Sequence, residues 1–213
     1  GAIITSASAL NDCTVDRTRV AQGFAPPDPT PYVNSKLTET ATSINSIHWV
    51  NGVADYQYSN TDQDFINHIN GLYSSNNIVL THTHGGSSGG SSFMTFLDGY
   101  SDLYDSDVNN WLDSGGYFIF AGACKSAQYS DLGNSFLNKG FDGYLGFEGD
   151  VSSVTCSCFY SAFFERGRYL DVTVSNAATY ALQTTLNEWD DYGGTDSKEI
   201  LGSQYLCLAP SDW

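Results

Sequence analysis

Two short apolar runs, each ending at a chemically reactive residue, constrain the fold more than any other feature of the chain. The first, NIVLTHTHGG, ends at His82 and His84, and the second, YFIFAGAC, ends at Cys124. Both runs are short and rich in β-branched and aromatic residues, which is typical of strands buried on both faces of a parallel sheet. Helices must cover both faces of such a sheet, so the runs favour a three-layer α/β domain.

The other apolar patterns supply the remaining elements of this domain. Apolar runs predict strands at 2–6, 47–50, 77–81, 117–121, 143–147 and 204–208. Apolar residues at helical spacing predict helices at 61–73, 92–112, 130–140, 153–168 and 175–189. Residues 23–32 hold four of the five prolines and predict an extended loop. We therefore expect one domain over residues 1–213, an α/β/α sandwich with a mostly parallel sheet of about six strands.

The charge of the chain argues against two classes of partner. It has 24 acidic side chains against 8 Lys and Arg, a formal net charge of −16. Such a surface repels phosphate backbones and anionic lipids, so we expect neither nucleic acid nor a membrane as partner. Solubility alone is the alternative explanation of this acidity. No apolar run is long enough to span a bilayer.

Cysteine content bears on the compartment. The five cysteines are an odd number, so at least one is unpaired within the chain. Cys156 and Cys158 are too close in sequence to bond to each other easily, which leaves pairing with Cys13 or Cys207 open. The composition favours a secreted or extracellular protein, and a cytoplasmic location is the alternative, since the sequence starts without a signal peptide.

His84 and Cys124 form a potential catalytic pair. Ligands of parallel sheets gather at the carboxyl ends of strands, and one crossover of about 40 residues places the two strands side by side. A nearby imidazole can take the thiol proton and generate a nucleophilic thiolate. The N–H groups of Gly85 and Cys124 would then stabilise an oxyanion. The pair indicates a cysteine hydrolase, although Cys124 taken alone would favour a small buried residue at a strand end.

The two runs together resemble the motif pair of the caspase–hemoglobinase superfamily (clan CD) of cysteine peptidases, a hydrophobic run with His-Gly and then one with Ala-Cys. The segments LGNSFLNKGFDGYLGFEGDV and FYSAFFERG resemble the segments after the cysteine in its gingipain and CHAT branches. The resemblance, over residues 75–185, implies a cysteine endopeptidase with His84 as dyad histidine and Cys124 as nucleophile. It also implies a peptide or protein substrate and a thioester intermediate, and we expect no cofactor.

Two acidic residues bear on specificity. Glu148 and Asp150 follow the predicted strand 143–147, where several members of the superfamily carry an acid that pairs with a basic P1 side chain. The resemblance thus implies cleavage after Arg or Lys, with Asp150 the favoured partner. Solvated carboxylates in an acidic protein are the alternative. The segment around Cys124 lacks a caspase-like sequence, so aspartate specificity is not expected.

His82 has no assigned role in the dyad. Two residues before His84, it would lie on the same side of one strand, as a metal ligand, a second base or an inert neighbour. We favour the inert neighbour, because no HExxH or similar spacing offers further metal ligands. Two other functions stay open: a non-catalytic binding or surface domain of the same fold, and a metal-dependent hydrolase using His82 and His84. The following GSSGGSS predicts a mobile loop at the mouth of a substrate cleft, with a plain flexible connection as the alternative.

Overall fold

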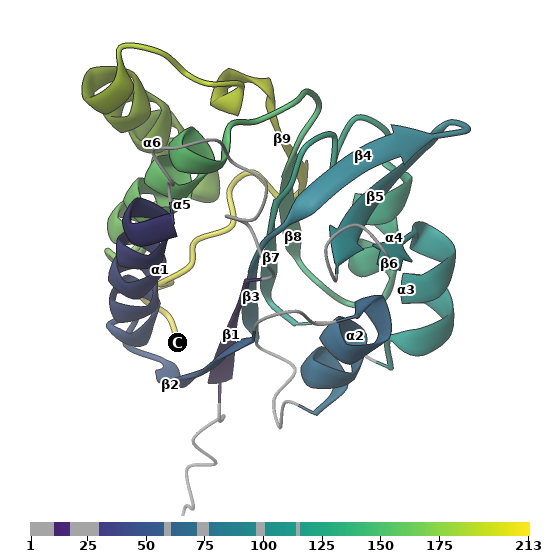
Figure 1. Cartoon of the computed structure of the whole chain (residues 1–213). Helices are drawn as coiled ribbons and strands as arrows, with labels where there is room; N and C mark the ends of the chain where they lie inside the picture. Colours follow the sequence, from purple (N-terminus) through teal and green to yellow (C-terminus); the bar gives the residue numbers. More distant parts are fainter. Residues whose placement is uncertain (1–10, 18–29, 58–60, 72–76, 97–100, 114–115) are drawn as a thin grey trace, which may run out of the picture.

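A six-stranded sheet forms the centre of the molecule in the computed structural model (Figure 1). The structure describes residues 11–17, 30–57, 61–71, 77–96, 101–113 and 116–213, with the backbone alone for 11–17, 30 and 51–57. In spatial order the strands are β2 (Val50–Gln57), β1 (Asn11–Arg17), β3 (Ile78–His82), β7 (Phe118–Gly122), β8 (Gly143–Phe147) and β9 (Lys198–Gly202). The first five are parallel, and β9 runs antiparallel to β8.

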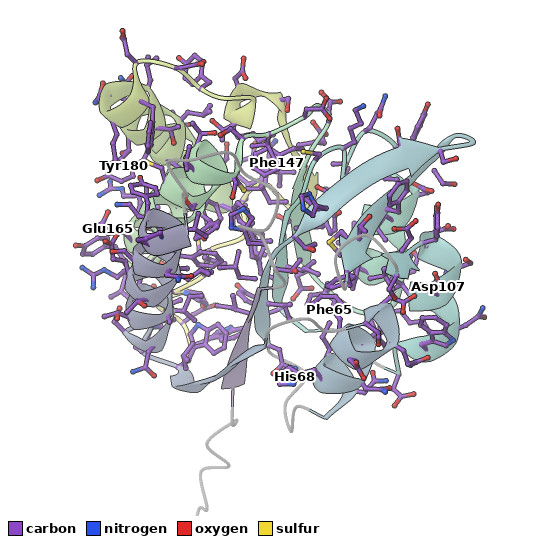
Figure 2. The ribbon with its side chains drawn as sticks, viewed as in Figure 1. Phe65, His68, Asp107, Phe147, Glu165 and Tyr180 are labelled. Atoms are coloured by element: carbon purple, nitrogen blue, oxygen red, sulfur yellow. The ribbon has the colours of Figure 1, made fainter. Side chains whose placement is uncertain are left out.

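The sheet separates two apolar cores, because alternate residues of a strand point to opposite faces. In β7, Phe118 and Phe120 enter one core and Ile119 the other. One face is covered by α1 (Thr30–Asn45), α5 (Ser153–Gly167) and α6 (Val174–Trp189), and the other by α2 (Asp62–Asn70), α3 (Asp105–Trp111) and α4 (Asp131–Asn138) (Figure 1). Figure 2 shows Phe147 and Phe65 on opposite sides of the sheet. The predicted α/β/α sandwich is confirmed.

Most predicted core elements match the structure closely. The predicted strands at 77–81, 117–121 and 143–147 correspond to β3, β7 and β8, and the predicted helices at 61–73, 130–140, 153–168 and 175–189 correspond to α2, α4, α5 and α6. The predicted strand at 2–6 lies outside the described residues. These matches share strong, regular apolar periodicity, which is the most reliable local pattern in a sequence.

The two ends of the predicted sheet are corrected. No strand forms at 204–208, and the edge strand is β9, whose mixed polar sequence KEILG reflects its half-exposed position. The strand predicted at 47–50 begins only at Val50, because α1 extends to Asn45 and buried Ile47 packs behind it. Helix α1 was not predicted, since its many Ser, Thr and Asn residues are weak helix formers that hide the buried Val33 and Leu37.

The segment around residues 84–112 differs most from expectation. The predicted helix 92–112 is wrong over its first half, which forms β5 (Ser91–Phe96) and β6 (Ser101–Leu103). These strands and β4 (His84–Ser88) make a small antiparallel sheet in the order β4-β5-β6. The GSSGGSS stretch is a β-hairpin and not a loop, because Gly89 and Gly90, with φ of 61° and 89°, make its tight turn.

Within the ranges that the structure describes, no helix is both long enough and apolar enough to cross a bilayer.

Candidate active site

The carboxyl ends of β3 and β7 lie next to each other and carry the residues singled out in the sequence. The strands pair in parallel register from Ile78 opposite Phe118 to His82 opposite Gly122. The crossover between them contains the β4–β6 sheet and α3 rather than one long helix. A cavity of about 170 Å³ opens at these strand ends, lined by His82, Thr83, His84, Gly122, Cys124, Val151, Ser152 and Ser153. The structure thus brings His84 and Cys124 to one cavity.

Gly85 lies directly against the backbone of Cys124. A Cβ atom at position 85 would be 2.5 Å from the Cys124 carbonyl oxygen and 2.8 Å from the Ala123 Cβ atom. Only glycine therefore lets the start of β4 approach the Cys124 loop this closely. The Cys124 N–H group has no hydrogen-bond acceptor in the described part of the chain, so it is available to an oxygen of a ligand.

The thiol of Cys124 faces the beginning of α5. The Val151 N–H group donates to Cys124 Sγ at 3.3 Å, and the thiol donates to the Val151 carbonyl oxygen at 3.4 Å. Val151 precedes Ser152, the N-cap of a 15-residue helix. The positive end of the helix dipole and the Val151 N–H group both favour a negative charge on sulfur.

The backbone turns sharply at the residue that follows Cys124. Lys125 has a φ of 54°, in the left-handed region that non-glycine residues rarely adopt. Its N–H group donates to the Gly149 carbonyl oxygen at 2.8 Å, which connects the turn that contains Cys124 to the segment that follows β8. The sharp turn presents Cys124, which is half-buried, toward the cavity.

His82 is buried and His84 is exposed, so the two imidazoles differ in environment. The expectation that both lie on one side of one strand is wrong, because β3 ends at His82 and β4 begins at His84. The His82 ring nitrogens lie 3.1 Å from Tyr160 Oη and 3.5 Å from Ser153 Oγ. Burial, and then the charge of the nearby His84, lower the pKa of His82 to about 3. His82 is therefore neutral at pH 7.

The acidic residues predicted to select the substrate lie beside the cavity but do not line it. Glu148 and Asp150 are exposed in the segment after β8. Asp150 Oδ1 is 3.5 Å from Lys125 Nζ, and the Asp150 side chain is 77% exposed. Glu148 forms no ion pair with any described side chain, although its N–H group donates to the Ser197 carbonyl oxygen.

The remaining cysteines are not paired with one another. Cys156, Cys158 and Cys207 are free thiols, as is Cys124, while only the backbone of Cys13 is described. Burial raises the pKa of the Cys156 thiol well above its usual value. Among the described residues, no three His, Cys, Asp or Glu side chains gather as potential metal ligands.

Several contributors to the site had no sequence signature. Val151 acts through its backbone, and Ser153 and Tyr160 reach the site through the packing of α5. A Ser or Tyr in an apolar helix looks like ordinary core material, so only the tertiary structure shows that Tyr160 meets His82.

The fold has well-defined structural relatives. The Arg-specific cysteine proteinase gingipain R superimposes with a TM-score of 0.66 at 13% identity, covering 94% of this chain and 48% of that one. Caspase-1 from Spodoptera frugiperda gives a TM-score of 0.54 at 11% identity, covering 96% of this chain and 88% of that one. The chain thus has the caspase–hemoglobinase fold of clan CD cysteine peptidases, although it spans only about half of gingipain R.

A close relative in sequence places the chain more narrowly. It is 54% identical over 187 residues to an "uncharacterized protein" of Archaeoglobus fulgidus, covering 85% of this chain and 96% of that protein. The chain belongs to the same family as this archaeal protein. No family model matches the sequence.

Proposed function

We propose that the chain is a cysteine endopeptidase with His84 and Cys124 as its catalytic dyad. The observation that carries this proposal is the shared cavity, in which both side chains lie with Gly85 against the backbone of Cys124. The fold supports the same reaction class, because its solved relatives are cysteine peptidases.

In the proposed reaction His84 removes the proton from the Cys124 thiol, and the thiolate attacks the carbonyl carbon of the scissile peptide bond. The Val151 N–H group and the start of α5 favour the thiolate before attack. The N–H groups of Gly85 and Cys124 stabilise the oxyanion of the tetrahedral intermediate. His84 then gives its proton to the leaving amine, a thioester forms on Cys124, and water hydrolyses it to release the acid.

The proposed substrate is a peptide or protein cleaved after a basic residue. Glu148 and Asp150 lie in the segment that leads into the cavity wall at Val151. Lys125 already neutralises part of the charge of Asp150, so Glu148 is the freer carboxylate for a cationic P1 side chain. The description of gingipain R as Arg-specific agrees with this choice.

The two alternatives are less well supported. A non-catalytic domain would not need a thiol and an imidazole in one cavity. A hydrolase with a metal held by His82 and His84 conflicts with the surroundings of His82, whose two ring nitrogens already face Tyr160 and Ser153.

A peptide-cleavage assay with dyad variants tests the proposal. We expect Cys124→Ala to abolish cleavage and His84→Ala to lower kcat by at least about 10³-fold, because the loss of either dyad partner removes the activated nucleophile. Cys207→Ala is the matched control and should retain full activity. Full activity of Cys124→Ala, or activity that requires bound zinc, would contradict the proposal.

A panel of peptides that differ only at P1 tests the specificity. We expect Arg and Lys peptides to be cleaved fastest, and Glu148→Gln with Asp150→Asn to lower that preference about tenfold relative to a leucine peptide. Asp113→Asn removes one carboxylate before the amino end of β7, at the opposite end of the parallel strands, and should leave the preference unchanged. Equal rates for basic and neutral P1 residues would rule out the acidic pocket.

A further inference from the structure

A chain of buried polar groups runs beneath the cavity. It links Ser153 Oγ to His82 Nε2 at 3.5 Å and His82 Nδ1 to Tyr160 Oη at 3.1 Å. His82 is 2% exposed, Ser153 is 7% exposed, and Tyr160 is fully buried. The imidazole and the Tyr160 ring also meet edge to face, with centroids 5.2 Å apart. A polar group buried to this degree is costly unless it is satisfied, so the hydrogen bonds that link the three side chains stabilise the site.

The chain of polar groups joins β3, which ends just before His84, to α5, which begins just after the Val151 partner of the Cys124 thiol. His82 is the last residue of β3, two positions before His84. Ser153 and Tyr160 belong to α5, and Val151, just before this helix, donates to Cys124 Sγ. The hydrogen bonds therefore hold the end of β3, two residues before His84, close to the start of α5, where Val151 donates to the thiol.

A glycine on β7 permits this close packing of α5. A Cβ atom on Gly122 would lie 3.3 Å from Cys156 Sγ and 2.8 Å from the Thr81 carbonyl oxygen. Because Gly122 pairs with His82 across the strands, the missing side chain lets the first turns of α5 reach the end of β3. Packing and hydrogen bonding thus act at the same place.

The Ser153–His82–Tyr160 arrangement is not a second catalytic triad. A serine nucleophile needs a histidine that accepts its proton, and a neutral imidazole with a pKa of about 3 is too weak a base for that. Burial is the main cause of this low pKa and the charge of nearby His84 is the second, so His82 stays neutral beside the proposed base.

We infer that His82 is a positioning residue of the dyad, a neutral hydrogen-bond bridge between Tyr160 and Ser153 that holds His84 in line with Cys124. This inference rests on the proposed peptidase function. It gives the first histidine of the THTH segment a role that is neither metal binding nor proton transfer.

Steady-state kinetics of peptide cleavage by full-length variants test the inference. His82→Phe keeps a ring of similar shape without its hydrogen bonds, and Tyr160→Phe removes one hydroxyl group. We expect kcat to fall about 10²-fold in His82→Phe and about tenfold in Tyr160→Phe, with KM changed less than about twofold, because misplacement of the dyad slows chemistry more than binding. His82→Gln, which can donate and accept, should recover part of the loss.

Additivity and a matched control separate positioning from general destabilisation. The double variant His82→Phe/Tyr160→Phe should be no slower than His82→Phe, because both changes break one bridge. Tyr117→Phe removes the hydroxyl of a buried tyrosine that donates to the Cys207 carbonyl oxygen, away from the cavity, and should leave kcat unchanged.

The possible outcomes are distinct. If the wild-type chain cleaves peptides and Tyr160→Phe and His82→Gln both keep the wild-type kcat, the inference is wrong and the proposed function stands. The inference would also be overturned if the variants raised KM and left kcat unchanged, or if the two substitutions had additive effects on kcat in the double variant. If the wild-type chain cleaves no peptide, the proposed function fails and the inference fails with it. Should His82→Phe not fold, the two milder variants still decide.

Discussion

Gly85 is the residue whose lack of a side chain matters most to the proposed chemistry. We predict that Gly85→Ala lowers kcat/KM at least about tenfold. The new Cβ atom would meet the Cys124 carbonyl oxygen at 2.5 Å and push the start of β4, which carries His84, away from the backbone of Cys124. Gly71→Ala is the control, since its Cβ atom would have no contact closer than 3.4 Å and its φ of −77° suits any residue. Unchanged kinetics of Gly85→Ala would show that the close approach is not required.

The low pKa of His82 predicts how the stability of the protein depends on pH. The pKa is about 3 in the folded chain against 6.5 for an ordinary histidine, so the unfolded chain binds more protons between these values. The stabilisation is complete above about pH 6.5 and is lost as the pH falls toward about 3, by up to about 1.4 kcal/mol per pH unit.

Chemical denaturation at several pH values measures this dependence. His84, Tyr160 and Cys156 surround or adjoin His82, and many carboxylates also titrate at acidic pH, so the informative quantity is the difference in slope between wild type and His82→Gln. We expect the wild type to lose stability more steeply between pH 6.5 and pH 3. Parallel slopes would mean that His82 takes up its proton over the same pH range in the folded and the unfolded chain, so that burial does not lower its pKa.

At the residue scale the sequence predicted the reactive groups but not their partners. His84 and Cys124 follow strong apolar runs, and strand ends of this kind are where ligands gather. Val151, Ser153 and Tyr160 depend on where α5 docks, which no local pattern in the sequence specifies. For the same reason His82, next to His84 in the sequence, proved to belong to a buried hydrogen-bond chain.

Among the helices, α2 shows how local sequence fixes an element boundary. Thr61 accepts a hydrogen bond from the Asp64 N–H group, and Asp64 accepts one from the Thr61 N–H group, which forms a capping box. We predict that Thr61→Ala lowers the free energy of unfolding by about 1 kcal/mol in chemical denaturation. Thr38→Ala, at an exposed site inside α1, should cause little change or a small gain, because alanine is the better helix former. Equal effects would refute the cap.

At the element scale, prediction succeeded where apolar periodicity was strong and failed where tertiary contacts override it. The aromatic residues of 92–112 fit helical spacing, yet the turn at Gly89 and Gly90 pairs β4 with β5 and commits the first half to strands. The edge strand β9 and the polar helix α1 have few regularly spaced apolar residues, because much of the surface of each faces solvent or neighbouring polar groups.

At the scale of the whole molecule, the net charge of −16 opposes the compact state. Few ion pairs offset it among the described residues, where only Lys36 and Lys125 form salt bridges with acidic side chains. We predict that raising the ionic strength from about 0.01 M to about 0.5 M raises Tm, since salt screens repulsion between exposed charges. A Tm that falls or stays constant in calorimetry would contradict a surface dominated by repulsion.

The architecture as a whole was predictable because each large element repeats one rule, an apolar strand followed by a helix that covers it. The parallel neighbours β3 and β7 follow from that rule, whereas the order of the other strands was not predicted. The small sheet beside the site does not, because it is an insertion into one crossover.

The proposed mechanism requires that His84 activates Cys124. The most direct measurement is the rate at which iodoacetamide alkylates Cys124 at pH 7, mapped by mass spectrometry in the wild type and in His84→Ala, with Cys207 as the internal reference. We expect Cys124 in the wild type to react at least about tenfold faster than Cys207, and His84→Ala to remove this advantage. Equal rates for the two thiols in the wild type, or a rate at Cys124 that does not change in His84→Ala, would contradict it.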